Sequence, residues 1–479
     1  MLYDNAEGEK SDLVYGIRMG TWNRTGVRIC NGTILQGRRG GSRSAPLRGS
    51  FQAPEIAGLT LDYHGDDTNG VEYYLACEDY HHNVTVDRGM VISNRHQGLR
   101  AYAGTVRNFA WNSLRRIRNW GVSQAARVYE NEFYGDSYET NSYMVSMGSG
   151  GEVAGNKFHG VGYNPIGVGV WTSAEDVRVH DNFIYLHATA NRMRSTEYNR
   201  LSGVAGIRLT VYSGEDAALF KNLLFEGNTI VAKPWDKGVL VRGLWVSMGT
   251  INTVYRDNTV KVEALTDDLL AIPTQRFQQT IACVDLNGAS NPQPPVTLFE
   301  GNAFISNVQF ISFGSSYGSG NDNALFSHTH LEKIDHHTAN YVPFTIGYWT
   351  WNAIANTMMN TTASGLDLAA NPLFCGTAPA DLRMGNTAAL TFVNQFGKPL
   401  ANKTIRIAVD GTWQYYHKSG GTLRPADIPE EFTDTSYKLT INTDSAGRAD
   451  VGFIEIFHFL RSGDAAERMA LTTPATVAC

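Results

Sequence analysis

The sequence predicts an all-β protein: a right-handed parallel β-helix solenoid of about eleven coils, followed by a small antiparallel β-sandwich. Three observations support this fold. A short phrase with a central asparagine recurs along the chain, a phrase that begins with glycine accompanies it, and the C-terminal part changes to alternating apolar and polar residues. The predicted boundary separates the β-helix, residues 1–385, from the sandwich, residues 386–479.

The composition favours an ordered chain. Charged residues make up 18% and apolar residues 42% of the 479 residues, which excludes intrinsic disorder. A chain of this length exceeds one ordinary core, unless a repeat extends the core along an axis. The formal net charge of -6 provides no generally basic surface, so nucleic acid is not an expected partner.

The first phrase is an apolar residue, two variable residues, asparagine, one variable residue and a second apolar residue. Its central residues are Asn131, Asn156, Asn182, Asn228, Asn258 and Asn302. They lie 25, 26, 46, 30 and 44 residues apart, which fits single coils with two intervals enlarged by an insertion or a degenerate coil. Asparagine tolerates a left-handed backbone and bonds neighbouring backbone through its amide. We therefore expect an asparagine ladder at a bend, with a looser copy at Asn31.

The second phrase is glycine, an apolar residue and a variable residue. Glycine allows the chain to turn, the apolar residue points inward and the next residue points outward, so this phrase predicts another sheet of the coil. Its copies include Gly16-Ile17-Arg18, Gly70-Val71-Glu72, Gly98-Leu99-Arg100, Gly206-Ile207-Arg208 and Gly238-Val239-Leu240.

Through these phrases, residues 14 to about 385 resemble the pectate-lyase-like superfamily, which includes polysaccharide lyases, glycoside hydrolases, epimerases and phage tailspikes. Asn371-Pro-Leu-Phe374 and Asp381-Leu-Arg-Met384 are similar to the phrase that closes the solenoid in many members. The catalytic motifs of the polygalacturonase-like hydrolases and alginate epimerases are absent, so no catalytic residue is carried over. The usual N-terminal capping helix is also missing, so we expect upstream sequence or a neighbouring subunit to cover the first coil.

Alternating residues after Ala389, with a turn at Gly397-Lys-Pro, predict an antiparallel hairpin. Residues 442–450 predict a second turn before another strand. This part resembles the Ig-like, carboxypeptidase-regulatory type of sandwich, which implies a spacer or a binding appendage.

Outward positions of the glycine phrase form a predicted row of functional side chains. Guanidinium groups bind carboxylates or sulfates of an acidic glycan, while tyrosine or histidine can remove a proton next to a uronate carboxylate. The alternative is that the arginines are solvated and paired with acidic residues of neighbouring coils. The predicted substrate-binding residues are Arg18, Arg48, Tyr74 and Arg208, and the predicted catalytic residues are Arg100, Tyr102, His96 and Glu72.

Two further patterns concern metals and thiols. The segment 78–83 contains carboxylate and imidazole side chains that suit calcium or a softer ion, so calcium is a possible cofactor. The five cysteines are widely spaced, with no C-x-x-C pair, so we expect buried thiols and neither a disulfide framework nor a structural zinc site.

The predicted function is binding or cleavage of an acidic polysaccharide, as a lyase or a glycoside hydrolase. One alternative is a non-catalytic structural, adhesin or filament-forming protein, which would form homo-oligomers or assemble end to end. A further alternative is a tailspike-like trimer. Residues 1–5 do not begin a signal peptide, and no run of 18 apolar residues predicts a membrane span. Extracellular or cell-surface localisation therefore implies an export signal outside this chain.

Overall fold

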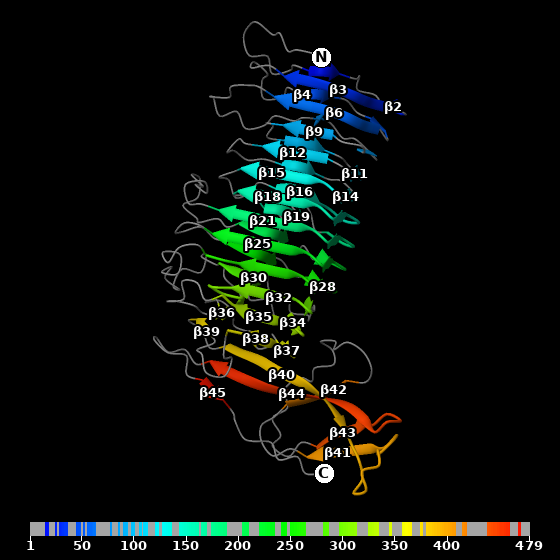
Figure 1. Ribbon diagram of the computed structural model, residues 1–479, viewed down its shortest axis with the longest axis vertical. Helices are drawn as coiled ribbons and strands as arrows, with labels where there is room; N and C mark the ends of the chain where they lie inside the picture. Colours follow the sequence, from blue (N-terminus) through cyan, green and yellow to red (C-terminus); the bar gives the residue numbers. More distant parts are fainter. Residues whose placement is uncertain are drawn as a thin grey trace.

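The computed structural model is a parallel β-helix whose last coil joins an antiparallel sheet (Figure 1). Within the described residues every regular element is a β-strand, and no helix there is long and apolar enough to cross a membrane. The structure describes residues 15–18, 24–25, 28–36, 45–48, 51–52, 55–63, 77–78, 85–86, 90–93, 97–100, 105–107, 109–113, 120–123, 127–136, 143–161, 164–169, 174–188, 204–209, 220–234, 241–246, 250–264, 281–286, 297–313, 324–334, 344–346, 357–365, 374–376, 380–408, 414–418, 438–459 and 468–470.

The coils place their strands in three columns, each with parallel pairing between neighbouring coils. Column A precedes the asparagine bend: β8 (Thr85–Val86), β11 (Thr105–Arg107), β14 (Arg127–Tyr129), β17 (Glu152–Ala154), β20 (Arg178–His180), β24 (Leu224–Glu226), β28 (Thr253–Arg256), β31 (Thr297–Glu300), β34 (Ala324–Ser327) and β37 (Thr357–Met359). Column B follows it: β9 (Met90–Ser93), β12 (Phe109–Ser113), β15 (Glu132–Asp136), β18 (Lys157–Val161), β21 (Phe183–Ala188), β25 (Thr229–Pro234), β29 (Thr259–Val262), β32 (Ala303–Ser306), β35 (His330–Lys333) and β38 (Thr362–Ser364).

Column C is a separate sheet: β10 (Gln97–Arg100), β13 (Trp120–Ser123), β16 (Tyr143–Met147), β19 (Asn164–Val168), β22 (Val204–Leu209), β26 (Val241–Val246), β30 (Ala282–Leu286), β33 (Ile311–Phe313), β36 (Phe344–Ile346) and β39 (Phe374–Gly376). In the first coils, β3 (Arg28–Gln36) and β6 (Glu55–Tyr63) run through both A and B, beside the small sheet β1 (Tyr15–Arg18), β4 (Ala45–Arg48) and β7 (Cys77–Glu78). Two short parallel pairs complete the solenoid: β2 (Arg24–Thr25) with β5 (Phe51–Gln52), and β23 (Phe220–Lys221) with β27 (Thr250–Ile251). These registers confirm the predicted parallel β-helix.

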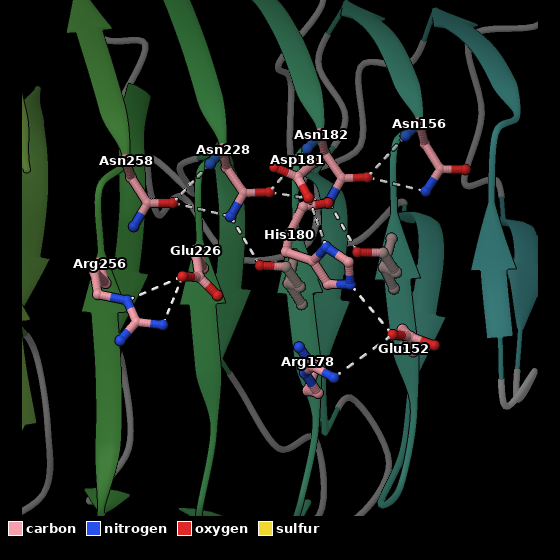
Figure 2. Close-up of polar contacts among 12 residues, drawn as sticks. Glu152, Asn156, Arg178, His180, Asp181, Asn182, Glu226, Asn228, Arg256 and Asn258 are labelled. Carbon is pink, nitrogen blue, oxygen red and sulfur yellow. Dashed lines mark hydrogen bonds and ion pairs between the residues drawn. The ribbon is translucent and has the colours of Figure 1, made fainter.

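The asparagine ladder is buried, and from Asn156 to Asn302 both polar atoms of each side-chain amide are hydrogen-bonded (Figure 2). Asn228 illustrates the pattern, because its Oδ1 accepts from the backbone N–H of Asn182 at 3.2 Å and from Asn182 Nδ2 at 2.9 Å. Its Nδ2 donates to the carbonyl of Val179 and to Asn258 Oδ1, both at 2.9 Å. An amide offers two donor hydrogens and two acceptor lone pairs, so its hydrogen-bonding capacity is used completely. The predicted ladder is confirmed.

The ladder also explains the two long intervals between asparagines. Asn182 bonds directly to Asn228 and Asn258 directly to Asn302, although 46 and 44 residues separate them. Both intervals are therefore single coils with insertions. Threonine occupies the next two ladder positions, as Thr329 and Thr361, so a search for asparagine does not find them.

The left-handed backbone lies one residue before each ladder asparagine, at Glu130, Gly155, Asp181, Gly227, Asp257 and Gly301. The expectation that the asparagine itself turns the chain was wrong. The amide is buried in the stack, whereas the preceding residue turns the backbone nearer the surface and can be Gly, Asp or Glu. In the first coil Asn31 has a φ of 54° and is exposed, so it holds the turn position and is not a ladder residue.

Inward side chains of column A stack along the solenoid axis. The rings of Phe225, Tyr255, Phe299 and Phe326 lie 4.4 to 4.6 Å apart and nearly parallel. The Tyr255 hydroxyl is buried without a hydrogen-bond partner, and burial raises the pKa of this phenol. The Tyr255 hydroxyl is therefore a buried polar group in an apolar stack whose hydrogen bond is not made.

The two cysteines with described side chains differ. Cys283 is fully buried in the core, and burial raises the pKa of its thiol, as expected for a packing residue. Cys30 is exposed, contrary to the expectation, because it lies on the outward side of β3 next to Ile29, which packs against the core.

The strand β40 (Ala380–Thr391) joins the solenoid to the C-terminal sheet. Its residue Arg383 pairs in parallel with Thr357 of β37, while β44 (Arg448–Phe459) pairs with β40 in antiparallel fashion along its whole length. The strands β42 (Gln414–Lys418) and β45 (Arg468–Ala470) then pair with β44. The predicted boundary at residue 385 falls inside β40; that boundary and the sandwich stay predictions.

The two predicted C-terminal turns are present. Gly397 has a φ of 74° and Gly447 a φ of 73°. The first turn is closed in antiparallel fashion by the bridge between Val393 and Pro399, with Asn394 N–H donating to the Lys398 carbonyl and Leu400 N–H to the Phe392 carbonyl, both at 2.8 Å. The strand that follows, β41 (Thr404–Ala408), pairs with β43 (Lys438–Asn442).

We predict that Asn228→Ala destabilises the solenoid strongly. The substitution removes four hydrogen bonds and leaves the backbone N–H of Asn182 and the carbonyl of Val179 without their partner. Each buried unpaired group costs about 1–3 kcal/mol, so the free energy of unfolding should fall by at least about 3 kcal/mol in chemical denaturation. Thr259→Ala, at a half-buried position beside the ladder, is the control; an equal loss for both variants would contradict the role of the ladder.

We also predict that Tyr255→Phe raises the melting temperature. It removes a buried hydroxyl that has no partner and keeps the ring stacked between two phenylalanines, which should add about 1 kcal/mol. The reverse substitution Phe299→Tyr should lower the melting temperature. Calorimetry of both variants checks the pair, and a lower value for Tyr255→Phe would refute the explanation.

Candidate functional site

Half of the predicted site residues lie in described strands. Arg18, Arg48, Arg100 and Arg208 lie in β1, β4, β10 and β22. The other four, Glu72, Tyr74, His96 and Tyr102, lie outside the described residues.

The register aligns the described arginines in rows. Arg18 lies beside Arg48, and the next residue in that row is Glu78, so Glu78 takes the position predicted for Glu72. The strand that pairs with β4 begins six positions further along the chain than the glycine phrase predicts. The row of Arg18 and Arg48 therefore continues as predicted, but its third member is Glu78 and not Glu72.

Arg100 and Arg208 occupy equivalent positions of column C. Arg100 aligns through Ser123, Ser146 and Gly167 with Arg208. Four strand spacings separate the two arginines, which corresponds to about 19 Å along the sheet. Between the two arginines Ser146 is 4% exposed and Gly167 is buried, so the row is not open to solvent along this whole length.

Beyond Arg208 the same row continues with Trp245 and Asp285. Because Ile207 pairs with Leu244, the glycine phrase of this coil is Gly243-Leu244-Trp245 and not the predicted copy that begins at Gly238. The phrase cannot find Asp285 at all, since Cys283-Val284-Asp285 contains no glycine.

A bend at Gly243 brings Arg242 to the same side of the sheet as Trp245. A Cβ at Gly243 would lie 2.1 Å from Val260 Cγ1, so this position faces the interior, as does the core residue Leu244. Two consecutive inward positions break the strict alternation of a strand. Arg242 and Trp245, three residues apart, can therefore meet.

The indole ring of Trp245 contacts two guanidinium groups. The Cζ atoms of Arg208 and Arg242 lie 3.9 and 4.1 Å from the ring centroid. Each cation–π contact contributes up to about 2 kcal/mol when it is shielded from water.

Arg242 also forms a buried ion pair with Asp285. Arg242 is 3% exposed and Asp285 is fully buried. Burial lowers the pKa of the Arg242 guanidinium, the charge and hydrogen bond of Asp285 raise it, and the nearby charge of Arg208 lowers it further. The Arg242 guanidinium therefore lies near one carboxylate, that of Asp285, and one further cation, that of Arg208.

Three donors of this cluster are buried without acceptors: Arg208 Nε, Arg242 Nη1 and Trp245 Nε1. Within the described residues Arg208 forms no ion pair with a carboxylate, although its side chain is only half-buried. Buried donors without acceptors are rare in folded proteins and costly. We call Arg208, Arg242, Trp245 and Asp285 the arginine–tryptophan cluster; it can accept an anionic group.

The outer face of column A carries charges that neutralise one another (Figure 2). Glu152 Oε1 lies 3.2 Å from His180 Nε2 and 4.0 Å from Arg178 Nη1, while His180 Nδ1 lies 2.8 Å from Asp181 Oδ2. Glu226 and Arg256 pair in the same way two coils further along. These side chains satisfy one another, so they form cross-coil ion pairs rather than a binding site.

The predicted calcium segment is described only at Glu78, and residues 79–83 lie outside the described residues. Among the residues with described side chains, no group of three or more His, Cys, Asp or Glu is placed to hold a metal ion.

We predict a large difference between two ion-pair variants. Asp285→Ala leaves the buried Arg242 without its carboxylate and should lower the free energy of unfolding by about 3–5 kcal/mol. Glu226→Ala breaks the partly exposed pair with Arg256 and should cost less than about 1 kcal/mol. Denaturation with urea compares them, and similar losses would show that Asp285 does not serve as the counter-ion.

No protein-family model and no curated protein sequence matches this chain. Solved structures that match include an alginate lyase from a Paenibacillus species, at 11% identity and a TM-score of 0.30, covering 72% of this chain and 95% of that one. A tailspike protein of Escherichia coli bacteriophage HK620 matches at 9% identity and a TM-score of 0.36, covering 93% and 85%. An alginate lyase in complex with G6 matches at 8% identity and a TM-score of 0.32, covering 82% and 85%.

Proposed function

We propose that this protein binds an acidic polysaccharide along column C, with the arginine–tryptophan cluster holding a carboxylate or sulfate group. The observation that carries the proposal is the set of three buried donors without acceptors, in a cluster where Asp285 pairs with Arg242 and no ion pair of Arg208 is found among the described residues. An anionic oxygen group supplies both the missing acceptors and the missing negative charge. Arg208 is the half-buried member through which the ligand is reached.

The register supports a polymeric ligand at the two ends of the row. Arg100 lies in the same register row as Arg208, and β7, which ends the row of Arg18 and Arg48, lies beside β10. The intervening Ser146 and Gly167 are buried, so a chain of acidic sugars would meet a cation at each end and not along the whole row. Polymers of this kind are outside the cell or on its surface, which is where we propose that the protein acts.

Cleavage by β-elimination is the chemical extension of this proposal. An arginine that neutralises a uronate carboxylate stabilises the charge that develops when a base removes the proton from the adjacent ring carbon. The electron pair forms a ring double bond, the glycosidic bond to the leaving oxygen breaks, and that oxygen takes up a proton. Tyr102 or His96 is the proposed base, with Arg100 and Glu72 beside it; their roles rest on the sequence pattern.

A structural or filament-forming role is the alternative, and one observation disfavours its end-to-end form. Growth through the column A strands requires an open edge at the end of the solenoid. In the described part of the chain β44 pairs along all of β40 and is itself paired with β42 and β45. A tailspike-like trimer would associate side by side and is tested by sedimentation.

The proposal is tested with hexameric galacturonate, guluronate and mannuronate and a heparin hexasaccharide. We expect at least one to bind in calorimetry, with affinity that falls as salt rises, and Arg208→Ala to weaken it at least about tenfold. Arg178→Ala, which removes an arginine from the neutralised surface of column A, is the matched control. New ultraviolet absorbance from unsaturated ends would establish cleavage.

Binding that is equal in the Arg208 and Arg178 variants would place the ligand elsewhere. Absence of binding by all four oligosaccharides, with calcium supplied, would refute an acidic-glycan function.

A further inference from the structure

An aromatic patch lies on column B, away from the arginine–tryptophan cluster of column C. Strict alternation turns Phe133, Phe158 and Ile184 into the core, where each is fully buried. The next residue on each strand therefore points outward: Tyr134, His159 and Tyr185. Phe183 lies two positions before Tyr185 on the same outer side.

The patch exposes two large aromatic rings, since Tyr134 is 43% and Phe183 40% exposed. The positions aligned with Phe183 in neighbouring coils are the polar residues Lys157 and Thr229. Both exposed rings lie next to the His159 ring, with centroids 4.8 and 6.3 Å away, so they form one surface that another molecule can cover.

The ring geometry gives the patch two kinds of surface. Tyr134 and His159 stack at 4.8 Å with planes 7° apart, so their edges, which carry the hydroxyl and the ring nitrogens, point away from the sheet. Phe183 is tilted by 54° against His159 and does not continue this stack. Its exposed ring can therefore receive an apolar surface while the neighbouring edges offer hydrogen bonds.

The charges beside the patch cancel. Lys157 Nζ lies 3.7 Å from Glu132 Oε1, on the positions next to the stacked rings. The patch therefore attracts neither an anion nor a cation strongly, in contrast to the arginine–tryptophan cluster. An uncharged ligand with an apolar face and a rim of hydroxyl groups is complementary to it, and a pyranose ring has this form.

A second copy of the chain is a poorer occupant. A stable interface buries about 800 Å² on each partner around a desolvated apolar centre. Within the described residues the patch offers two exposed large apolar side chains, bordered by an ion pair. That suffices for one or two sugar rings but not for a dimer.

We propose that Tyr134, His159 and Phe183 form a second, separate glycan-binding site that takes uncharged pyranose units. The parallel strands space these side chains about 4.8 Å apart along the axis, comparable with one sugar residue of an extended chain. This site does not depend on the arginine–tryptophan cluster, so it holds whether or not the proposed acidic ligand is correct.

The test uses the full chain with cellohexaose, mannohexaose and N-acetylchitohexaose, followed by saturation-transfer NMR and calorimetry. We expect at least one to bind, Phe183→Ser and Tyr134→Ser to weaken it at least about tenfold, and Arg208→Ala to leave it unchanged. Phe396→Ser is the matched control, because Phe396 is 77% exposed in the turn that follows β40. Unchanged melting temperatures exclude a folding defect in these surface variants.

Two results would overturn the proposal. One is no binding by any of the three hexasaccharides, or equal binding by the Phe183→Ser and Phe396→Ser variants. The other is a wild-type oligomer in sedimentation velocity that Phe183→Ser dissociates, which would assign the patch to a second copy of the chain.

Discussion

The side-chain amide at the bend is the interaction on which the solenoid depends. Each ladder asparagine accepts the backbone N–H of the asparagine in the preceding coil and donates to a carbonyl of that coil, as Asn258 does with Asn228 and Phe225. A slip of one residue between coils would break these bonds and turn every inward side chain outward. The ladder therefore sets the register that stacks the inward aromatic side chains of column A and aligns the arginine row of column C.

Register explains why residues of the arginine–tryptophan cluster that are far apart in sequence meet. Arg242 and Asp285 are 43 residues apart, yet they lie in adjacent strands of column C. The insertions that lengthen two coils leave the strands aligned, because the ladder contacts across them are the same as elsewhere. The number of residues in a coil can vary in the segments between the strands, whereas the ladder and the strand pairing fix the register of the strands themselves.

The sequence predicted the fold well because the repeated interaction uses a single residue type at a fixed place in each phrase. It identified Arg208 for the same reason, through Gly206-Ile207-Arg208. It missed Arg242, which reaches the cluster only because the strand bends at Gly243, and Asp285, whose strand carries no glycine. Cross-strand pairing over tens of residues leaves no local pattern. The left-handed turn was assigned one residue too late, since the turn residue is Asp or Glu in three of the six phrases and glycine in the other three, and so gives no single-residue signal.

The strand β40 has a mechanical consequence. Its twelve residues pair with β44, and its first part is also the final rung beside β37, so no flexible segment lies between rod and terminal sheet. A pulling force along β40 would act on all the backbone hydrogen bonds between β40 and β44 at the same time, and would not break them one after another. The strand shared by the last coil and the terminal sheet therefore links the two directly, through the pairing of β40 with β37 and with β44.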